Sequence, residues 1–342
     1  MLGCLHQVWG MKYLLLLFIP AVCLFNLGFA FDSPLWAEEC QPLTLITSVD
    51  MIPVKDDDAV LLPTKLNGSD VPMLLDTGAA FSEISQQAAD RLKLDTRHVD
   101  LEMVGVSGDT SNVVAKAQSF VLGRLHASSM DFVVSKSLDH LQGLADGLFA
   151  ANLLTSYDVE LDFANHKFNL MSPDHCEGKV IYWPASAIAV VPISRLRSGH
   201  IMMPVVLDGV RMNALIDTGA TKTTLSLPMA QGSFHLKVNT VDTPDAGDLG
   251  GNPNTRKYKH RFNRLDFGDI AVANPTVYII PDLMKAKLGH TPPLGTRIRD
   301  EDELYGLPDL ILGMDVLRHL HLYIAYRESK LYATPESASP PH

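Results

Sequence analysis

The sequence predicts a mostly β protein made of two similar lobes, with few short helices. The tetrapeptide Asp-Thr-Gly-Ala occurs twice, at residues 76–79 and 217–220. Each copy ends an apolar run, which is typical of a buried strand that delivers a carboxylate into a tight turn. Most other segments are short runs of strand-forming residues between turn residues, such as 113–117 and 130–134.

The repeat extends upstream of the tetrapeptide. Residues 62–75 align without a gap with residues 203–216 and share a Pro, a Leu, a Gly and a later Leu. Asn67-Gly68 and Asp208-Gly209 lie in the middle of these stretches, and both pairs are strong hairpin-turn formers. Each half is therefore predicted to contain a strand, a tight turn, a second strand and then the acid.

A second repeated block lies downstream. Residues 146–154 resemble residues 309–317, and an alternating strand pattern follows each block, at 159–163 and 322–326. The offset between the tetrapeptides is 217 − 76 = 141 residues, whereas the offset between the later blocks is 309 − 146 = 163. The second half therefore carries about 22 extra residues, and the chain is read as an internal duplication.

The domain boundaries follow from this duplication. We expect a signal peptide at residues 1–30, an N-terminal arm at 31–42, a first lobe at 43–171, a linker at 172–186, a second lobe at 187–334 and a disordered tail at 335–342. One helix is predicted after the first tetrapeptide, because Ser85 is a good N-cap for residues 86–92.

The N-terminal segment has the features of an export signal. An apolar stretch from Tyr13 to Ala30 follows Lys12, and Met11 is a second candidate for the start of the chain. Pro20 and Asn26 interrupt the stretch, which favours a cleaved signal over the alternative, a permanent N-terminal membrane anchor. No stable membrane span is expected after removal of the signal. We therefore expect an exported bacterial protein that is periplasmic or secreted.

Two of the four cysteines lie outside this signal. Cys40 and Cys176 bracket the first half, and in an oxidising compartment they could form a disulfide; the alternative is two free thiols. The net charge of −11 argues against nucleic acid as a partner. The largest basic cluster, residues 256–261, is interpreted as a solvated strand or loop face.

The repeated pattern resembles a known family. Two hydrophobic residues before Asp-Thr-Gly-Ala, and later two hydrophobic residues before a Gly, form the pattern of the retropepsin-like (retroviral-type) aspartic proteases. Ile311-Leu312-Gly313 matches the later element, whereas Leu148-Phe149-Ala150 departs from it, since Ala150 stands in place of Gly. The resemblance implies two homologous acid-protease-like β-barrel lobes related by a pseudo-twofold axis, carried in one chain in the manner of pepsin-like proteases.

The resemblance also implies an activity. Asp76 and Asp217 would share one proton and activate a water between them for attack on a peptide bond, with no covalent intermediate, no metal and no cofactor. The residues expected to support this pair, by a bond between the lobes, by close backbone approach or by hydrogen bonds from behind, are Thr77, Gly78, Ala79, Thr218, Gly219, Ala220, Ser82 and Thr223. Ala79 and Ala220 carry no hydroxyl, so a less acidic optimum than that of pepsin is expected.

A polypeptide bound as an extended strand is the expected partner, and the protein is expected to be a monomer. Glycine-rich loops near each acid are candidate flaps that would cover it. The candidates are Gly105, Val106, Ser107 and Gly108 in the first lobe and Gly247, Gly250 and Gly251 in the second. The alternatives are plain surface loops and, for the whole protein, a catalytically inactive peptide-binding module on the same fold.

Other hydrolase classes are poorly supported by the sequence. It contains no His-Glu-x-x-His pattern and no nucleophile-elbow pattern. His319-Leu320-His321 lacks a nearby cysteine or acid cluster, so surface or packed histidines are favoured over metal ligands. The function predicted from the sequence is therefore that of an aspartic endopeptidase.

Overall fold

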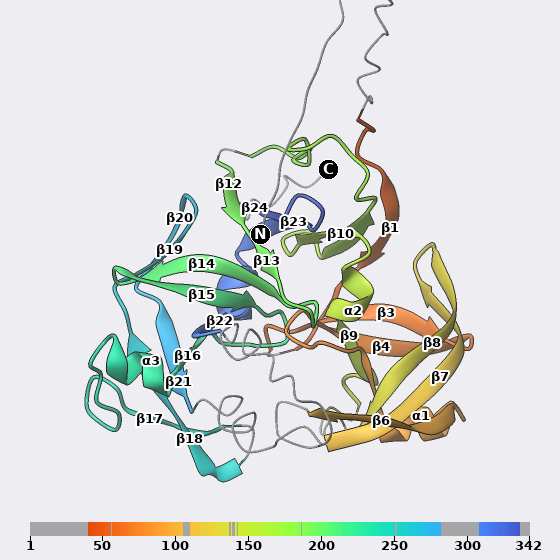
Figure 1. Cartoon of the computed structure of the whole chain (residues 1–342), viewed down its shortest axis with the longest axis horizontal. Coiled ribbons are helices and arrows are strands. Elements are labelled where there is room, and N and C mark those ends of the chain that lie inside the picture. The colour runs from red at the N-terminus through yellow and green to blue at the C-terminus, as the bar shows by residue number, and fades with distance from the viewer. Residues whose placement is uncertain are drawn as a thin grey trace, which may run out of the picture. The chain divides into compact units, whose positions relative to one another are not determined.

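The computed structural model of the chain describes residues 40–55, 57–104, 110–136, 138, 141, 143–185, 187–249, 252–281 and 308–335 (Figure 1). The predicted signal peptide, most of the N-terminal arm and all of the predicted tail after Pro335 lie outside these residues. Strands predominate and the helices are short, so the mostly β class predicted from the sequence is confirmed.

The elements of the first half, in chain order, are β1 (Leu45–Asp50), β2 (Ile52–Pro53), β3 (Val60–Leu66), β4 (Ser69–Asp76), β5 (Glu83–Ser85), α1 (Gln86–Arg91), β6 (Asp95–Val104), β7 (Thr110–Leu122), β8 (Leu125–Ser135), β9 (Gly147–Ala150), α2 (Ala151–Leu154), β10 (Asp158–Asp162) and β11 (Lys167–Met171). Those of the second half are β12 (Ala189–Pro192), β13 (Ser194–Arg195), β14 (Ile201–Leu207), β15 (Val210–Ile216), β16 (Thr224–Ser226), α3 (Leu227–Gly232), β17 (Asp245–Leu249), β18 (Asn252–Arg261), β19 (Arg264–Phe267), β20 (Ile270–Ala273), β21 (Thr276–Ile280), β22 (Leu310–Leu312), α6 (Met314–Leu317), β23 (Leu320–Ala325) and β24 (Lys330–Pro335).

Within the described residues the strands form three sheets. The first half builds one in the order β2-β3-β4-β9-β5-β8-β7-β6, and the second half builds one in the order β17-β18-β21-β16-β22-β15-β14-β19-β20, with β13 paired to β14. In both, the strand that leads to the acid lies parallel to the strand of the later block: β4 beside β9, and β15 beside β22. The duplicated blocks of the sequence are therefore neighbours within each sheet.

The predicted hairpin turns and helix are present. Asn67 and Gly68 have φ of 50° and 82°, and Asp208 and Gly209 have φ of 43° and 84°. Two successive residues with positive φ make a turn whose twist suits a two-residue hairpin, which is why Asn-Gly and Asp-Gly occur there. The hydroxyl of Ser85 accepts a hydrogen bond from the Ala88 N–H and caps α1, as predicted.

The third sheet is shared by the two halves. Its order is β1-β11-β10-β23-β24-β12, so three strands of each half lie in mirrored sequence on either side of a central β10–β23 pairing. That pairing is antiparallel, with Val159 opposite Ile324 and Leu161 opposite Leu322. These four side chains are fully buried in one core that contains residues of both halves. Burial of this apolar surface joins the halves through a continuous sheet.

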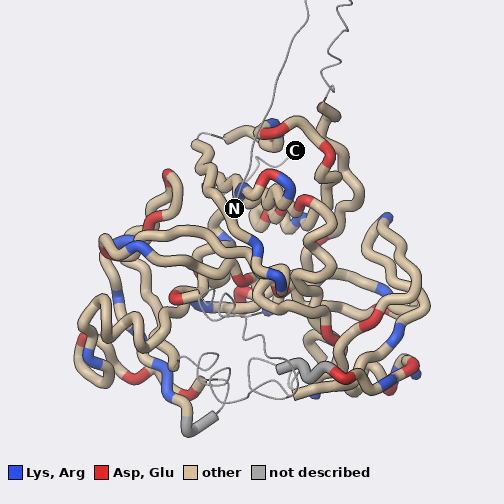
Figure 2. Tube along the Cα trace, viewed as in Figure 1, with Lys and Arg blue, Asp and Glu red and all other residues tan. Residues whose placement is uncertain are grey.

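The basic run at residues 256–261 lies on β18. The Arg256 guanidinium forms ion pairs with Asp245 and Asp248 of the neighbouring strand, and the Lys257 ammonium lies 5.8 Å from the centre of the Tyr278 ring. Acidic and basic positions are interspersed along the trace of both halves (Figure 2). Within the described part of the chain, no helix is both long and apolar enough to cross a bilayer.

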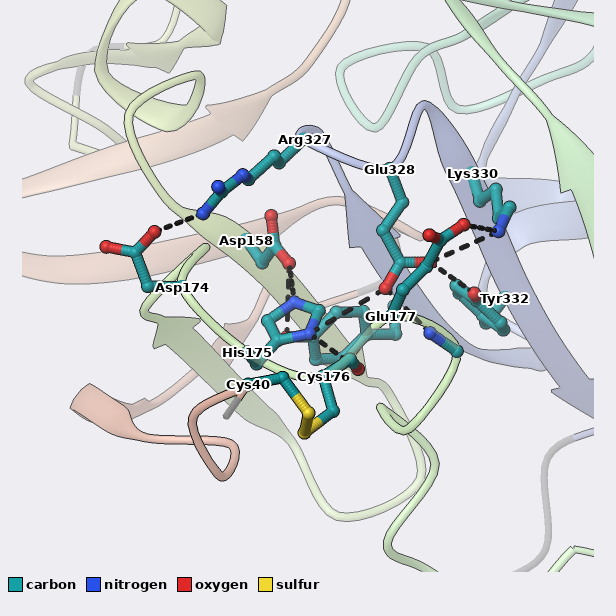
Figure 3. Close-up of polar contacts among 12 residues, drawn as sticks. Cys40, Asp158, Asp174, His175, Cys176, Glu177, Arg327, Glu328, Lys330 and Tyr332 are labelled. Atoms are coloured by element: carbon teal, nitrogen blue, oxygen red, sulfur yellow. Dashed lines mark hydrogen bonds and ion pairs between the residues drawn. A yellow bond between two sulfur atoms is a disulfide. The ribbon is translucent and has the colours of Figure 1, made fainter. Parts of the chain in front are cut away.

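The segment between the halves, residues 172–185, packs on the shared sheet. Val180 and Trp183 join an apolar cluster with Tyr323 and Tyr332 of the sheet. A disulfide between Cys40 and Cys176 ties the segment to the chain just before β1 (Figure 3). The two cysteines are 136 residues apart, and in the chain-entropy account a cross-link over so long a loop contributes about 4–5 kcal/mol.

A buried ion pair lies beside this disulfide (Figure 3). The His175 Nε2 atom lies 2.6 Å from Asp158 Oδ2, and its Nδ1 lies 3.2 Å from the Cys176 carbonyl oxygen. Both partners can only accept, so the doubly protonated ring suits both. Burial works to lower the pKa of His175, but the hydrogen bonds to Asp158 and Cys176 outweigh it and raise that pKa. Burial raises the pKa of Asp158 despite the presence of His175. The pair attaches the segment to β10.

We expect His175→Ala to lower the free energy of unfolding by about 3–5 kcal/mol, because it leaves the fully buried Asp158 carboxylate without its closest partner. Denaturant unfolding would measure the change. Arg327→Gln is the matched control, since it removes a solvent-exposed ion pair with Asp174 of the same segment and should cost less than about 1 kcal/mol. Equal small losses in both variants would show that the buried pair does not hold the segment.

Candidate active site

The two Asp-Thr-Gly-Ala loops begin where buried strands end. Asp76 is the last residue of β4, and Asp217 follows the last residue of β15. Leu75 and Ile216, which precede the acids, are fully buried. The apolar runs seen in the sequence thus fix both strand ends in the core and carry each acid to the edge of its sheet.

Reciprocal hydrogen bonds join the two loops. The Thr77 N–H donates to Thr218 Oγ1 at 3.1 Å, and the Thr218 N–H donates to Thr77 Oγ1 at 3.0 Å. Each hydroxyl then donates to a carbonyl of the opposite half, Thr77 to Ile216 at 2.8 Å and Thr218 to Leu75 at 2.9 Å. Both threonines are buried, so the four bonds are shielded from water. The structure brings the two loops together as the sequence predicted.

This arrangement places the acids face to face. The carboxyl groups of Asp76 and Asp217 lie close enough to each other to interact directly. A β-carbon added to Gly78 would lie 2.2 Å from the Asp217 Cγ atom, and one added to Gly219 would lie 2.4 Å from the Asp76 Cγ atom. Each glycine therefore lies against the carboxyl group of the other half, at a distance that no other residue type could occupy without displacing it.

Backbone N–H groups hold each carboxyl group from its own loop. The Gly78 N–H donates to Asp76 Oδ1 at 2.9 Å. The N–H groups of Gly219 and Ala220 donate to Asp217 Oδ1 at 2.8 and 3.0 Å. These donors stabilise the ionised form, and Asp217 receives two of them in this geometry.

The environment favours one proton on the pair. Burial, followed by the negative charge of Asp217, raises the pKa of Asp76 well above its ordinary value. Burial also raises the pKa of Asp217, although the N–H groups of Gly219 and Ala220 oppose this effect. Two carboxyl groups in contact cannot both ionise without a large repulsive cost. The geometry and the raised pKa of Asp76 together favour a proton on Asp76 and a negative charge on Asp217.

Ser82 and Thr223 connect the loops to the repeated downstream blocks, each through the same pattern of hydrogen bonds. The Ser82 N–H and hydroxyl both donate to Asn152 Oδ1, at 2.8 and 2.9 Å. The Thr223 N–H and hydroxyl both donate to Asp315 Oδ1, at 2.8 and 2.7 Å. Asn152 and Asp315 were not assigned a role from the sequence. Their equivalent places in the two repeated blocks were the signal that could have revealed them.

Ala150 stands in place of the expected Gly without disturbing the hydrogen bonds of Ser82. Its second-half counterpart is Gly313, where a β-carbon would lie 2.6 Å from the Lys222 backbone carbon. The Ala150 methyl group is instead fully buried, and the Ala150 N–H donates to the Ser82 hydroxyl at 3.0 Å. The Gly313 N–H makes the same bond to Thr223 at 3.2 Å. The first half therefore accommodates a methyl group that the second half has no room for.

The remaining predicted loop residues also lie at the site. The Ala79 carbonyl accepts a hydrogen bond from the Ala151 N–H at 3.1 Å, and the Ala220 carbonyl accepts one from the Met314 N–H at 2.8 Å. Each bond connects an Asp-Thr-Gly-Ala loop to the start of a short helix, α2 or α6. The repeated downstream blocks thus serve as supports for the loops that carry the acids.

The candidate flaps belong to two hairpins. Gly105, Val106, Ser107 and Gly108 lie outside the described residues, between the paired strands β6 and β7. Gly250 and Gly251 also lie outside them, between β17 and β18. Gly247 is described: it lies in β17 with φ of 97°, where the pairing with β18 is irregular. Its N–H donates to Asp245 Oδ1 at 2.8 Å.

His319 and His321, the one histidine pair considered as metal ligands, lie at β23. His321 Nε2 lies 2.8 Å from Glu160 Oε1, and its ring stacks on Trp183 with 3.7 Å between ring centres. In the described part of the chain, no group of three or more His, Cys, Asp or Glu side chains is arranged to hold a metal ion.

Comparison with known proteins adds a family match. The model of a family described as aspartyl protease matches residues 62–153 and 203–316, one segment in each half. The retropepsin-like resemblance inferred from the sequence is thereby confirmed. No curated protein matches the chain.

Three solved structures match the chain at low identity. Basic 7S globulin from soybean has 11% identity and a TM-score of 0.47, covering 87% of this chain and 96% of its own. Conglutin gamma, a basic 7S globulin from lupine seeds, has 10% identity and a TM-score of 0.49, covering 86% of this chain and 95% of its own. A retropepsin-like aspartic protease from Rickettsia conorii has 17% identity and a TM-score of 0.31, covering 45% of this chain and 96% of its own.

We expect Asp76→Asn to make the protein more stable at neutral pH. A carboxyl group whose pKa is raised by folding binds its proton more tightly in the folded state, so its ionisation costs stability as pH rises through the raised pKa. The amide cannot ionise and can still accept the Gly78 N–H. The gain should be about 1.4 kcal/mol or more at pH 7, and should vanish below the ordinary aspartate pKa of about 3.9.

Denaturant unfolding at pH 3 and pH 7 would measure this difference. Asp70→Asn is the control, because the Asp70 side chain is 84% exposed and should show no such dependence. If Asp76→Asn were destabilising at pH 7, the two carboxyl groups could not form a repulsive pair in solution.

Proposed function

The chain belongs to the aspartyl protease family, and we propose that it is an endopeptidase that hydrolyses peptide bonds through a water held between Asp76 and Asp217. The single observation that carries this proposal is the close approach of the two carboxyl groups across the interface of the halves. One acid with a proton and one without are what general acid–base catalysis requires.

The unequal environments assign the roles. Asp217, with two N–H donors on one oxygen, is the ionised base and takes a proton from the bound water. The resulting hydroxide attacks the peptide carbonyl carbon, while Asp76 donates its proton to the carbonyl oxygen. The tetrahedral intermediate collapses when the proton held by Asp217 passes to the leaving nitrogen and the hydroxyl proton returns to Asp76. The carboxyl pair ends with the one proton it had at the start.

A polypeptide in extended conformation is the substrate that suits this site. Main-chain hydrogen bonds to loops on both sides of the acids would hold such a strand, and the hairpins β6–β7 and β17–β18 would close over it. Both acids come from one chain, so a monomer contains the complete catalytic pair. The hairpins differ in strand length and pairing, which suggests that the two flaps are unequal.

The proposed localisation is outside the cytoplasm, as a periplasmic or secreted protein. The Cys40–Cys176 disulfide supports it, because such bonds persist in oxidising compartments. Residues 1–30 would then act as a signal peptide or, if not cleaved, as an N-terminal membrane anchor.

Asp76→Asn and Asp217→Asn should each reduce the rate of peptide cleavage by about 10²–10⁴-fold, because each removes one half of the acid–base pair. Mass spectrometry of a proteome-derived peptide library would detect the cleavage products, with Asp70→Asn as the active control. A statyl-type transition-state mimic such as pepstatin should inhibit the wild type.

Retained cleavage in both variants would reject the mechanism. Wild-type protein that binds the peptides but never cleaves them would instead identify the alternative, a catalytically inactive peptide-binding module on the same fold.

The pH dependence of kcat/KM should be bell-shaped, because one member of the pair must be ionised and the other protonated. The descending limb lies at the raised pKa of Asp76, so the optimum should be less acidic than that of pepsin. Ala79 and Ala220 offer no side-chain hydroxyl to the carboxylates, so only their backbone N–H groups act to lower these pKa values. Initial rates from about pH 2 to pH 8 would locate the optimum, and best activity below about pH 3 would contradict the assignment.

A further inference from the structure

A histidine of the second half contacts the catalytic loop of the first. His200 lies in the loop between β13 and β14, and its Nε2 atom lies 2.8 Å from the Gly78 carbonyl oxygen. Its Nδ1 atom lies 2.8 Å from the Ser198 hydroxyl oxygen. A carbonyl oxygen can only accept, so Nε2 carries a hydrogen and donates it. A neutral ring then accepts the Ser198 hydroxyl hydrogen at Nδ1, and both bonds are satisfied.

The protonation state agrees with this geometry. Burial lowers the pKa of His200, against the opposing effects of the Gly78 hydrogen bond and the Asp217 charge. The loop also approaches the first half closely at Gly199, which has φ of 91°. A β-carbon there would lie 3.1 Å from the Ala151 Cβ atom. Glycine thus permits the approach that brings the His200 ring to Gly78.

Gly78 is the point at which this contact can affect both acids. Its N–H donates to Asp76, and its Cα atom lies against the Asp217 carboxyl group. A change in the position of the Gly78 peptide would therefore alter the support of one acid and the space available to the other. His200 is the side chain of the second half that fixes the Gly78 carbonyl oxygen.

The first half has an alanine at the equivalent position. The position that corresponds to His200, by the 141-residue offset of the tetrapeptides, is 200 − 141 = 59, which is Ala59. Its methyl group cannot donate to the Gly219 carbonyl. The adjacent Asp58 instead forms ion pairs with Lys222 and Arg318 of the second half. The contact is therefore a departure from the twofold relation of the site.

We infer that His200 is a positioning residue for the acid pair: its neutral ring fixes the Gly78 peptide and so sets the approach of Asp76 to Asp217. The inference rests on the proposed function, because it assigns His200 to the reaction of that pair. It acts through Gly78 and does not itself exchange a proton with the substrate.

Three full-length variants test it. His200→Ala removes the donor to Gly78, and kcat for a peptide substrate should fall about 10- to 100-fold with KM changed less than about 3-fold. His200→Gln can still donate from its amide nitrogen to the same carbonyl, so kcat should stay within about 3-fold of the wild type. His126→Ala, at an exposed histidine of β8, is the control and should behave as the wild type.

A second readout does not depend on activity. Carbon-13 NMR titration of the Asp76 and Asp217 carboxyl groups should show a coupled pair in the wild type and in His200→Gln, and a weakened coupling in His200→Ala. Wild-type protein that shows a coupled pair but cleaves no peptide would defeat the proposed function and leave the His200 comparison intact. Unchanged titration and unchanged kcat in His200→Ala would overturn the inference, as would failure of His200→Gln to restore them.

Discussion

The structure depends on the four hydrogen bonds that Thr77 and Thr218 make across the interface of the halves. Two acids in contact repel each other when both ionise, so their approach has to be enforced by something stronger than their own interaction. Buried, reciprocal hydrogen bonds do this, because breaking one would leave a donor and an acceptor unsatisfied in the core. The β10–β23 pairing and the common core hold the loops from further away. Burial of the pair, followed by the charge of Asp217 at that enforced contact, raises the pKa of Asp76.

The two repeats differ in sequence where their contacts lie within one half, and they are identical where residues contact their counterparts across the interface. Ser82 with Asn152 and Thr223 with Asp315 use different side chains for the same three bonds, because each set lies within its own half. A substitution of one residue in such a set can be compensated by a substitution within the same half. The residues that meet their counterparts across the interface are identical in the two halves. The hydrogen bonds of Thr77 and the approach of Gly78 to the opposite carboxyl group are repeated by Thr218 and Gly219, and a change in one would have to be accepted by the other half.

The segment between the halves, residues 172–185, also helps to hold the two halves together. It crosses the shared sheet, and the Cys40–Cys176 bond and the His175–Asp158 pair hold it there. Tyr182 and Trp183 add hydrogen bonds to Glu160 of the first half and Thr334 of the second. Because β10 and β23 lie beneath it, the segment supports the seam between the halves as well as connecting them in sequence. A linker with so many fixed contacts limits how far the halves can move relative to each other.

The sequence by itself determined the repeated unit and its local structure. Two copies of an apolar run, an Asn-Gly or Asp-Gly turn and Asp-Thr-Gly-Ala were enough to predict the hairpins, the mostly β class and the pair of acids, and Ser85 predicted α1. The hairpins and the helix depend on residues close together in the chain, where turn geometry and capping act, whereas the pair of acids was predicted from the repeat. Tertiary structure alone decided other contacts between residues far apart in the chain. The sharing of the third sheet, the burial of His175 on Asp158, the role of Asn152 and Asp315, and the bond of His200 to Gly78 each join segments that no local preference brings together. The one-sided place of His200 could not be inferred from a repeat, since a repeat reports only what the two halves have in common.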